Sequence, residues 1–259
     1  MNFEGLPNTR DLGGMRTADG RAIRPGKLIR SGALIEARGG DLAKLAELLD
    51  TVVDFRTPKE CEEKPDPAIP GVVNLHMPVV RTISAGVTRE KKTDEEVFAR
   101  LAVHPDEALR HMSCAYVEFV EREEARQTYA RFVRLLMERH ERAVLWHCTA
   151  GKDRAGFATV ILQKLLGVAD DVILEDYLLT NTYLKDSYES LIALLKPTIP
   201  GLQNCPDDAL WTMFSADERY LQAAYDTADR LFGSFDGYLE KGLGFTQADR
   251  GTLRAMYLA

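Results

Sequence analysis

The fold is decided by a decapeptide in the second half of the chain, His147-Cys148-Thr149-Ala150-Gly151-Lys152-Asp153-Arg154-Ala155-Gly156. Before it, the apolar run 143–146 predicts a short buried strand. After it, residues 157–166 have the apolar spacing of a helix, and Gly167 is a natural C-cap for that helix. The decapeptide is therefore expected to close a strand, form a loop and open a helix.

This geometry predicts an anion site at the loop. Backbone N–H groups and the positive end of the helix dipole converge on one small volume, which suits a phosphoryl group. Arg154 lies six positions after Cys148 and carries a planar fork of donors that can hold two phosphoryl oxygens. The same field stabilises a cysteine thiolate. A nucleophile, an anion cradle and a fork-shaped cation at this spacing are typical of a phosphatase that works through a phosphocysteine intermediate.

The decapeptide resembles the signature of the cysteine-dependent protein tyrosine phosphatases, in which five residues separate a His-Cys pair from an arginine. Within this signature, the sequence of residues Ala150–Arg154 is similar to that of the bacterial atypical branch. That branch includes dual- and triple-specificity phosphatases and phosphoinositide phosphatases. Further stretches look like that branch and follow in its order, namely 8–14, 28–32, 52–60, 176–181 and the tail from Leu243 onward. The resemblance is interrupted mainly between about residues 81 and 115.

The remaining chain predicts an α/β fold. A helix is expected over 41–49 and short strands over 51–55 and 72–75, and this alternation favours a parallel sheet. The resemblance implies the cysteine-dependent phosphatase fold, a central, mostly parallel sheet flanked by helices, with a helical lid insertion and a helical C-terminal region. We expect a single tyrosine-phosphatase-like domain over residues 1–259.

Two segments outside the sheet carry separate expectations. Residues 81–112 contain charges of both signs and form either a solvated helical face or a mobile helical lid over the phosphate site. A long helix is expected over 116–140. Beyond Gly167 the pattern predicts four helices, over 170–183, 187–196, 217–232 and 246–258.

Composition limits the classes of function. The net charge of −7 argues against nucleic acid as a partner. No apolar run reaches the roughly 18 residues of a membrane span, and the first residues contain no apolar signal region. We therefore expect a cytoplasmic protein, and secretion without a signal peptide is compatible with these features. Four cysteines without metal-like or framework spacing are expected to be free thiols, at positions 61, 114, 148 and 205.

Each residue of the loop has an expected role. Cys148 is the proposed nucleophile, and Arg154 holds two equatorial oxygens of the transferring group. His147 points to the opposite side of its strand and supports the loop or the thiolate rather than acting as a base. Backbone donors are expected from Thr149, Ala150, Gly151, Lys152 and Asp153, with Gly151 suited to a left-handed position. The Lys152 ammonium either is solvated or contacts a further phosphate or an acidic substrate face.

The leaving group needs a proton, and three carboxylates compete to supply it. Asp153 is the first choice because it lies within the loop. Asp54 follows a strand whose carboxyl end faces the same crevice, although an ion pair with Arg56 or Arg10 is an alternative role for it. Asp94 serves only if a lid closes.

One residue departs from the resemblance. The residue after the arginine is usually Ser or Thr in the wider family, where its hydroxyl stabilises the departing cysteine sulfur, and here it is Ala155. Thr149 or Thr159 are the hydroxyls available to replace it. We expect hydrolysis of the phosphocysteine to be slower than its formation, with a burst of product.

The predicted activity is hydrolysis of phosphotyrosine, with phosphoserine, phosphothreonine or phosphoinositide as further substrates and inorganic phosphate as product. No cofactor is expected, and the other histidines form no ligand arrangement for a metal. Ala155 favours one alternative, a pseudophosphatase that binds phosphorylated partners without turnover. A second alternative, redox chemistry or arsenate reduction on the same loop, requires Cys114 as the resolving cysteine.

Overall fold

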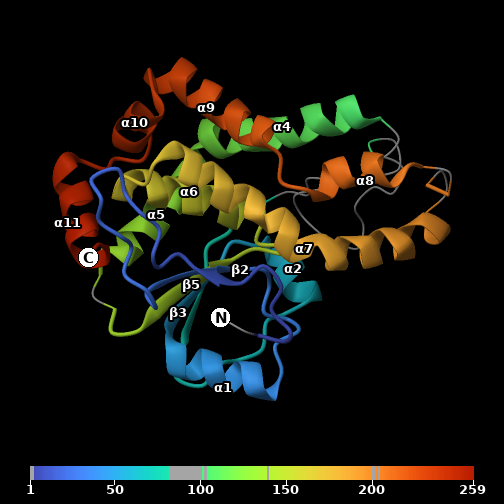
Figure 1. The fold of residues 1–259 in the computed structure, drawn as a ribbon, viewed down its shortest axis with the longest axis horizontal. Coiled ribbons are helices and arrows are strands. Elements are labelled where there is room, and N and C mark those ends of the chain that lie inside the picture. The colour runs from blue at the N-terminus through green and yellow to red at the C-terminus, as the bar shows by residue number, and fades with distance from the viewer. Residues whose placement is uncertain (1–2, 82–100, 102–103, 139, 200–201, 204) are drawn as a thin grey trace.

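A five-stranded sheet forms the centre of the computed structural model, which describes residues 3–81, 101, 104–138, 140–199, 202–203 and 205–259 (Figure 1). The strands lie in the order β1-β2-β5-β3-β4. β1 pairs with β2 in the antiparallel sense, and the other pairs are parallel. Their bounds are β1 Arg10–Asp11, β2 Leu28–Ser31, β3 Leu49–Asp54, β4 Val73–His76 and β5 Ala143–His147. The predicted fold class, an α/β fold with a mostly parallel sheet, is confirmed.

The central strand β5 is buried along its whole length, as its apolar run predicted. It lies between β2 and β3, and His147 at its end is in register with Ser31 of β2 and Asp54 of β3. The carboxyl ends of three parallel strands therefore meet at one edge of the sheet. This edge is where ligands bind in open α/β sheets.

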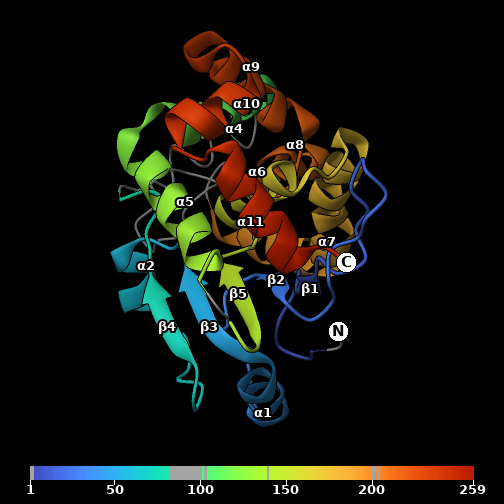
Figure 2. The same cartoon turned by 90° about the vertical axis from the view of Figure 1, so that its left-hand side faces the viewer.

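Helices cover both faces of the sheet (Figures 1 and 2). α1 packs on one face, where its Leu45 belongs to a hydrophobic cluster with Ile29, Val52 and Leu145 of the sheet. A larger hydrophobic core lies on the other face, beneath α4, α5, α6, α9 and α11. The helix bounds are α1 Gly39–Leu48, α2 Pro58–Glu63, α4 Pro105–Glu121, α5 Glu123–Leu136, α6 Arg154–Leu166, α7 Asp170–Thr198, α8 Asp207–Phe214, α9 Glu218–Phe232, α10 Phe235–Gly237, the π-helix Tyr238–Gly242 and α11 Gln247–Tyr257.

The prediction of a single helix over 116–140 is wrong, because two helices, α4 and α5, meet at Arg122. Arg122 has an extended backbone and ends α4, and α5 begins at Glu123. The Arg126 guanidinium donates to the carbonyl of Val120 at 2.9 Å, which satisfies an acceptor at the end of α4. The acidic first turn of α5 also suits a helix start. Apolar periodicity continued across this break and did not reveal it.

The C-terminal region is helical, as predicted, but α7 is one helix of 29 residues where two were expected. Its distal half buries Leu184, Tyr188 and Ile192 in a second hydrophobic cluster with α8. That burial explains why the polar residues 185–187 stay helical. α8 was not predicted, whereas α9 and α11 match the expected 217–232 and 246–258.

Part of the 81–112 segment lies outside the described residues, namely 82–100 and 102–103. The solvated-face and lid hypotheses fall there and stay predictions, as does the single-domain division. The end of the segment belongs to α4, which begins at Pro105. Among the helices of the described ranges, none is both long and apolar enough to cross a membrane.

Candidate active site

Strand β5, the loop 148–153 and helix α6 form the predicted strand-loop-helix unit. Cys148 directly follows β5, and Arg154 is the first residue of α6. Both side chains are buried, with 2% of Cys148 and 0% of Arg154 exposed. The thiol and the guanidinium are therefore held by protein contacts rather than by solvent.

The loop carbonyls are bound from outside the loop. The amide N–H of Ala33 donates to the carbonyl of Thr149 at 3.0 Å. The side-chain amide of Asn8 donates to the carbonyl of Ala150 at 2.9 Å, and the Arg30 guanidinium donates to that of Gly151 at 2.7 Å. In a planar trans peptide, the next N–H points opposite to the carbonyl. The N–H groups of residues 150–152 therefore point away from these partners.

Gly151 is required by both conformation and space. Its φ of +70° lies in the left-handed region. A Cβ at this position would lie 2.5 Å from the carbonyl oxygen of Ser31, at the end of β2. The loop therefore rests directly on the neighbouring strand, and only glycine permits this approach.

A buried ion network holds the loop from the side of β1 and β2. The Asp176 carboxylate accepts from Arg10 at 2.7 Å and from Arg30 at 3.0 Å. Burial opposes ionisation of Asp176, but the two arginines lower its pKa below the usual value. Burial and the neighbouring Arg30 lower the pKa of Arg10 to about 10. Asp176 thus fixes the arginine that holds the Gly151 carbonyl.

Glu60 of α2 holds Arg154 from the side of β3. Its two carboxylate oxygens accept from the Arg154 guanidinium at 2.6 and 3.1 Å, and one of them also accepts from the Thr149 hydroxyl. Glu60 is also the third helical residue of a capping box with Thr57, which restricts its rotamer. Burial opposes ionisation, yet the charge of Arg154 lowers the pKa of Glu60 to about 2. The arginine is therefore preorganised by a permanent anion.

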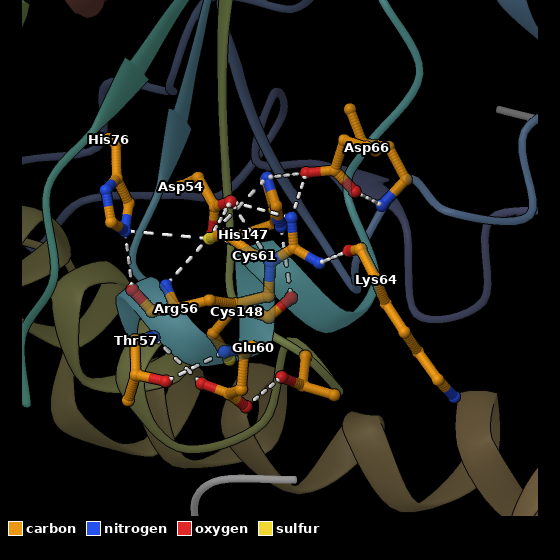
Figure 3. A network of polar contacts seen from close by, with 12 residues as sticks. Asp54, Arg56, Thr57, Glu60, Cys61, Lys64, Asp66, His76, His147 and Cys148 are labelled. Carbon is orange, nitrogen blue, oxygen red and sulfur yellow. Dashed lines mark hydrogen bonds and ion pairs between the residues drawn. The ribbon is translucent and has the colours of Figure 1, made fainter. Parts of the chain in front are cut away.

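A second ionic layer lies behind the loop, at the end of β3 (Figure 3). The Arg56 guanidinium pairs with Asp54 at 2.7 Å and with Asp66 at 2.5 Å. The His147 Nε2 atom lies 3.2 Å from Asp66, and its Nδ1 atom lies 3.0 Å from the carbonyl oxygen of Cys148. Burial lowers the pKa of His147, but Asp54 and Asp66 outweigh it and raise this pKa above the usual value. The position of His147 agrees with its expected supporting role.

Asp54 forms the ion pair with Arg56 that was the alternative to its role as an acid. Burial raises its pKa, but His147 and the hydrogen bonds from Arg56 outweigh this and bring the pKa well below the usual value. Asp54 therefore stays ionised at neutral pH and is poorly suited to donate a proton. Asp54, Asp66 and His147 lie close enough to hold a metal, but Arg56 already supplies the positive charge between the two carboxylates.

Asp153 precedes α6 and is 3% exposed. One of its oxygens, Oδ1, accepts from the Tyr116 hydroxyl at 3.0 Å and lies 3.5 Å from the Lys152 ammonium. Unlike Asp54, this carboxylate forms no bidentate pair with an arginine among the described residues.

The solvated alternative for Lys152 is wrong, since its side chain is 2% exposed. The ammonium donates to the carbonyls of Met213 and Ser215 at 2.9 and 3.2 Å, at the C-terminal end of α8. A cation suits this negative end of the helix dipole. Lys152 therefore connects the loop to α8.

Comparison with known proteins agrees with this geometry. A family model described as the tyrosine phosphatase family matches residues 1–259. The chain belongs to the tyrosine phosphatase family. A candidate tyrosine-protein phosphatase of Cupriavidus necator is 35% identical over 261 residues, covering 100% of this chain and 88% of that protein. The triple specificity protein phosphatase PtpB of Mycobacterium tuberculosis is 29% identical, covering 98% of this chain and 97% of that protein. The predicted family and the class of enzyme, a protein-tyrosine-phosphatase-type hydrolase of phosphoric monoesters, are confirmed.

Ala155 leaves this phosphatase without a hydroxyl after its arginine, and both expected substitutes have other partners. The Thr159 hydroxyl donates to the carbonyl of Ala155 at 2.8 Å and accepts from the Trp146 indole at 3.0 Å. The Thr149 hydroxyl donates to Glu60. These contacts leave the expectation of slow phosphocysteine hydrolysis in place.

The cysteines separate into distinct environments, and all four are free thiols in the structure. Cys114 lies on the exposed face of α4, whereas Cys148 is buried, which is unfavourable for Cys114 as a resolving cysteine. The Cys61 thiol donates to Asp54 at 3.2 Å, and burial followed by the charge of Asp54 raises its pKa to about 12. Cys61 therefore stays protonated at neutral pH.

The sequence prediction assigned no role to several residues that build the site. Asn8, Arg30, Glu60 and Asp176 lay in stretches that resembled the family, and the Thr57-to-Glu60 spacing of a capping box was also visible. Tyr116 carried no signal beyond membership of an apolar helix face.

Proposed function

We propose that this phosphatase hydrolyses phosphate monoesters through a covalent phosphocysteine on Cys148. The observation that carries the proposal is the preorganised loop: three of its carbonyls are bound from outside, which leaves the N–H groups of residues 150–152 facing away from these partners, in the loop between Cys148 and a buried arginine. Donors fixed before the reaction stabilise charge in the transition state without reorganisation.

In the first step, the Cys148 thiolate attacks phosphorus in line with the ester bond. A sulfur–phosphorus bond forms as the bond from phosphorus to the ester oxygen breaks, and its electron pair goes to that oxygen. Arg154 and the N–H groups of residues 150–152 bind the equatorial oxygens, and Glu60 keeps the guanidinium oriented. Asp153 donates the proton that the departing ester oxygen needs.

In the second step, water attacks the phosphocysteine. The Asp153 carboxylate accepts a proton from this water as the sulfur–phosphorus bond breaks and returns its electron pair to sulfur. The product is inorganic phosphate, which the loop and the N-terminus of α6 hold as an anion. Because Ala155 supplies no hydroxyl to the departing sulfur, this step limits the steady rate.

Asp153 is assigned as the acid rather than Asp54 because their surroundings differ. Arg56 and His147, which lie beside Asp54, lower its pKa and favour its charged form. Within the described part of the chain, the nearest donor to the Asp153 carboxylate is the neutral Tyr116 hydroxyl at 3.0 Å, and the carboxylate lies in the loop itself. Asp94, the third candidate, lies outside the described residues.

We propose phosphotyrosine as the principal substrate, with phosphoserine, phosphothreonine and phosphoinositide as further substrates. The name of the mycobacterial relative, a triple specificity phosphatase, supports the wider range. Binding of a further phosphate by Lys152 requires its ammonium to exchange the carbonyls of Met213 and Ser215 for that phosphate.

The test compares the wild type with Cys148→Ser and Arg154→Lys under reducing conditions. The substrates are 4-nitrophenyl phosphate, a phosphotyrosine peptide and a phosphoinositide. We expect Cys148→Ser to lower kcat by at least about 10,000-fold on each substrate while it still binds the peptide. Trapping of a phosphorylated wild-type enzyme, with the label on Cys148, completes the assignment. Peptide binding without turnover by the wild type would instead support the pseudophosphatase.

A further inference from the structure

Asp153 is bonded to one end of a buried chain of tyrosine hydroxyls. The Tyr116 hydroxyl of α4 lies 3.0 Å from Asp153 Oδ1 and 2.7 Å from the Tyr177 hydroxyl of α7. Tyr116 is 0% and Tyr177 is 1% exposed, so solvent does not compete for these bonds. Helices α4 and α7, which are far apart in the sequence, are thus connected to the Asp153 carboxylate by hydrogen bonds.

The direction of the chain is set at Asp153, because the Tyr116 hydroxyl donates its single proton to that carboxylate. The Tyr116 oxygen is then left to accept from the Tyr177 hydroxyl. Burial is the main cause that raises the pKa of both tyrosines well above the usual value, and the charge of Asp153 adds to it. Both hydroxyls are therefore protonated donors at neutral pH.

Ring packing alone does not explain why Tyr116 and Tyr177 carry hydroxyl groups, since phenylalanine could fill the same space. The Tyr116 ring lies among the rings of Phe119, Phe157 and Tyr220. Phenylalanine already fills two of these positions, and burying a hydroxyl is unfavourable unless it is hydrogen-bonded. The hydroxyls of Tyr116 and Tyr177 serve a polar contact, and that contact ends at Asp153.

We propose that Tyr116, supported by Tyr177, is a positioning residue that directs the proton of Asp153 to the leaving oxygen; this inference rests on the proposed role of Asp153 as the acid. The Tyr116 hydroxyl occupies Oδ1, and no described residue bonds Oδ2. The transferable proton is consequently carried on Oδ2, on the side of the carboxyl that is not bound by the tyrosine.

The chain also stabilises the product of proton transfer. The bond between Oδ2 and hydrogen breaks as hydrogen binds the ester oxygen, and the electron pair stays on Asp153. The resulting carboxylate faces the Tyr116 O–H and the Lys152 ammonium from α4 and the loop, with Arg154 beside it in sequence. Tyr220 of α9 and Tyr129 of α5 are the other titratable groups that face this charge. A hydrogen bond to an ionised acceptor is stronger than one to a neutral acceptor, so Tyr116 stabilises the transition state more than the ground state.

The experiment measures kcat/KM of Tyr116→Phe on phenyl phosphate and on 4-nitrophenyl phosphate. Phenolate is a poor leaving group and needs the proton, whereas 4-nitrophenolate leaves with little assistance. We expect a loss of about 10-fold on phenyl phosphate and at most about 2-fold on 4-nitrophenyl phosphate. Tyr177→Phe should give a smaller loss with the same selectivity.

Tyr220→Phe is the matched control, since its hydroxyl donates to the carbonyl of Thr212 at 2.6 Å and its ring lies 5.7 Å from that of Tyr116. It should not change the ratio between the two substrates. An equal loss on both substrates in Tyr116→Phe, or no loss on either, would overturn the inference. Thermal unfolding and inhibition by inorganic phosphate establish that each variant is folded and binds an anion.

The variant Asp153→Asn distinguishes the positioning role of Tyr116 from the acid role of Asp153 on which it rests. We expect this variant to lose about 100-fold on phenyl phosphate and much less on 4-nitrophenyl phosphate. Adding Tyr116→Phe should then cause no further selective loss, because the tyrosine acts through Asp153. If Asp153→Asn shows no selectivity, the acid assignment fails; if Asp153→Asn is selective and Tyr116→Phe is not, only the positioning role fails.

Discussion

The buried carboxylates on the two sides of the phosphate loop have different hydrogen-bonding partners. On the side of β3 and α2, Asp54 and Glu60 each meet an arginine at 2.6–2.7 Å. On the side of α4 and α7, Asp153 meets the Tyr116 hydroxyl at 3.0 Å and an ammonium only at 3.5 Å. All three carboxylates are almost fully buried, so burial alone does not distinguish them.

The difference lies in whether the group that is hydrogen-bonded to the carboxylate carries a charge. A carboxylate beside a guanidinium in a buried site loses a large attraction when it is protonated, and so it stays an anion. A carboxylate beside a neutral hydroxyl keeps its hydrogen bond in both protonation states. The first kind is suited to holding Arg154 and His147 in place, and the second kind is suited to giving and taking a proton.

The largest expected effect is that of Asp54→Asn on stability. Removing the anion leaves Arg56 beside Asp66 alone, and breaking a buried pair costs about 3–5 kcal/mol of unfolding free energy. Asp50→Asn on the same strand is the control, because its partner Arg142 is partly exposed and the pair is worth about 1 kcal/mol. Urea unfolding measures both. A stable Asp54→Asn with a loss confined to phenyl phosphate would transfer the acid role to Asp54.

Glu60→Gln should lower kcat/KM by about 100-fold, because an arginine without its anion no longer holds the phosphoryl oxygens in the productive geometry. The loss should be the same on phenyl phosphate and 4-nitrophenyl phosphate, in contrast to the variants of Asp153. Glu62→Gln, an exposed position on the same helix, is the control. A loss that depended on the leaving group would remove the distinction between the two sides.

The pH dependence of stability tests the charged side directly. Glu60 has a folded pKa of about 2 against an ordinary value of 4.5, so its contribution is complete above about pH 4.5. That contribution decreases as the pH falls from about 4.5 toward 2, because the unfolded state then binds a proton that the folded state does not bind until about pH 2. The difference in unfolding free energy between the wild type and Glu60→Gln should therefore shrink on acidification from pH 5. A difference that stays constant over this range would contradict the ionised assignment.

Ala155→Ser should produce the smallest effect, an increase in kcat of about 3-fold with kcat/KM unchanged. A hydroxyl at this position stabilises the departing sulfur in the second step, whereas both sides of the loop act already in the first step. Rapid-quench measurement of the product burst shows the change, since the burst should shrink as hydrolysis becomes faster. An unchanged burst would mean that another group already assists the sulfur.

The sequence predicted features whose residues lie close together along the chain, and it missed contacts between residues that are far apart along it. Cys148 and Arg154 are six positions apart, and the strand, loop and helix around them were predicted from local spacing. The pairs that give each carboxylate its role join distant positions: Glu60 lies 94 residues before Arg154, and Tyr116 lies 37 before Asp153. The break at Arg122 was missed because apolar periodicity continued across it.

The sequence by itself determined the strand, the loop and the helix that carry Cys148 and Arg154, because the apolar spacing and the glycines that define these elements are local to residues 143–167. Only the tertiary structure decided which partner each carboxylate meets. The packing of β3, α2 and α4 around the loop supplies a guanidinium to Glu60 and Asp54 but a hydroxyl to Asp153. These partners come from distant parts of the chain, and a guanidinium beside a buried carboxylate favours its charged form.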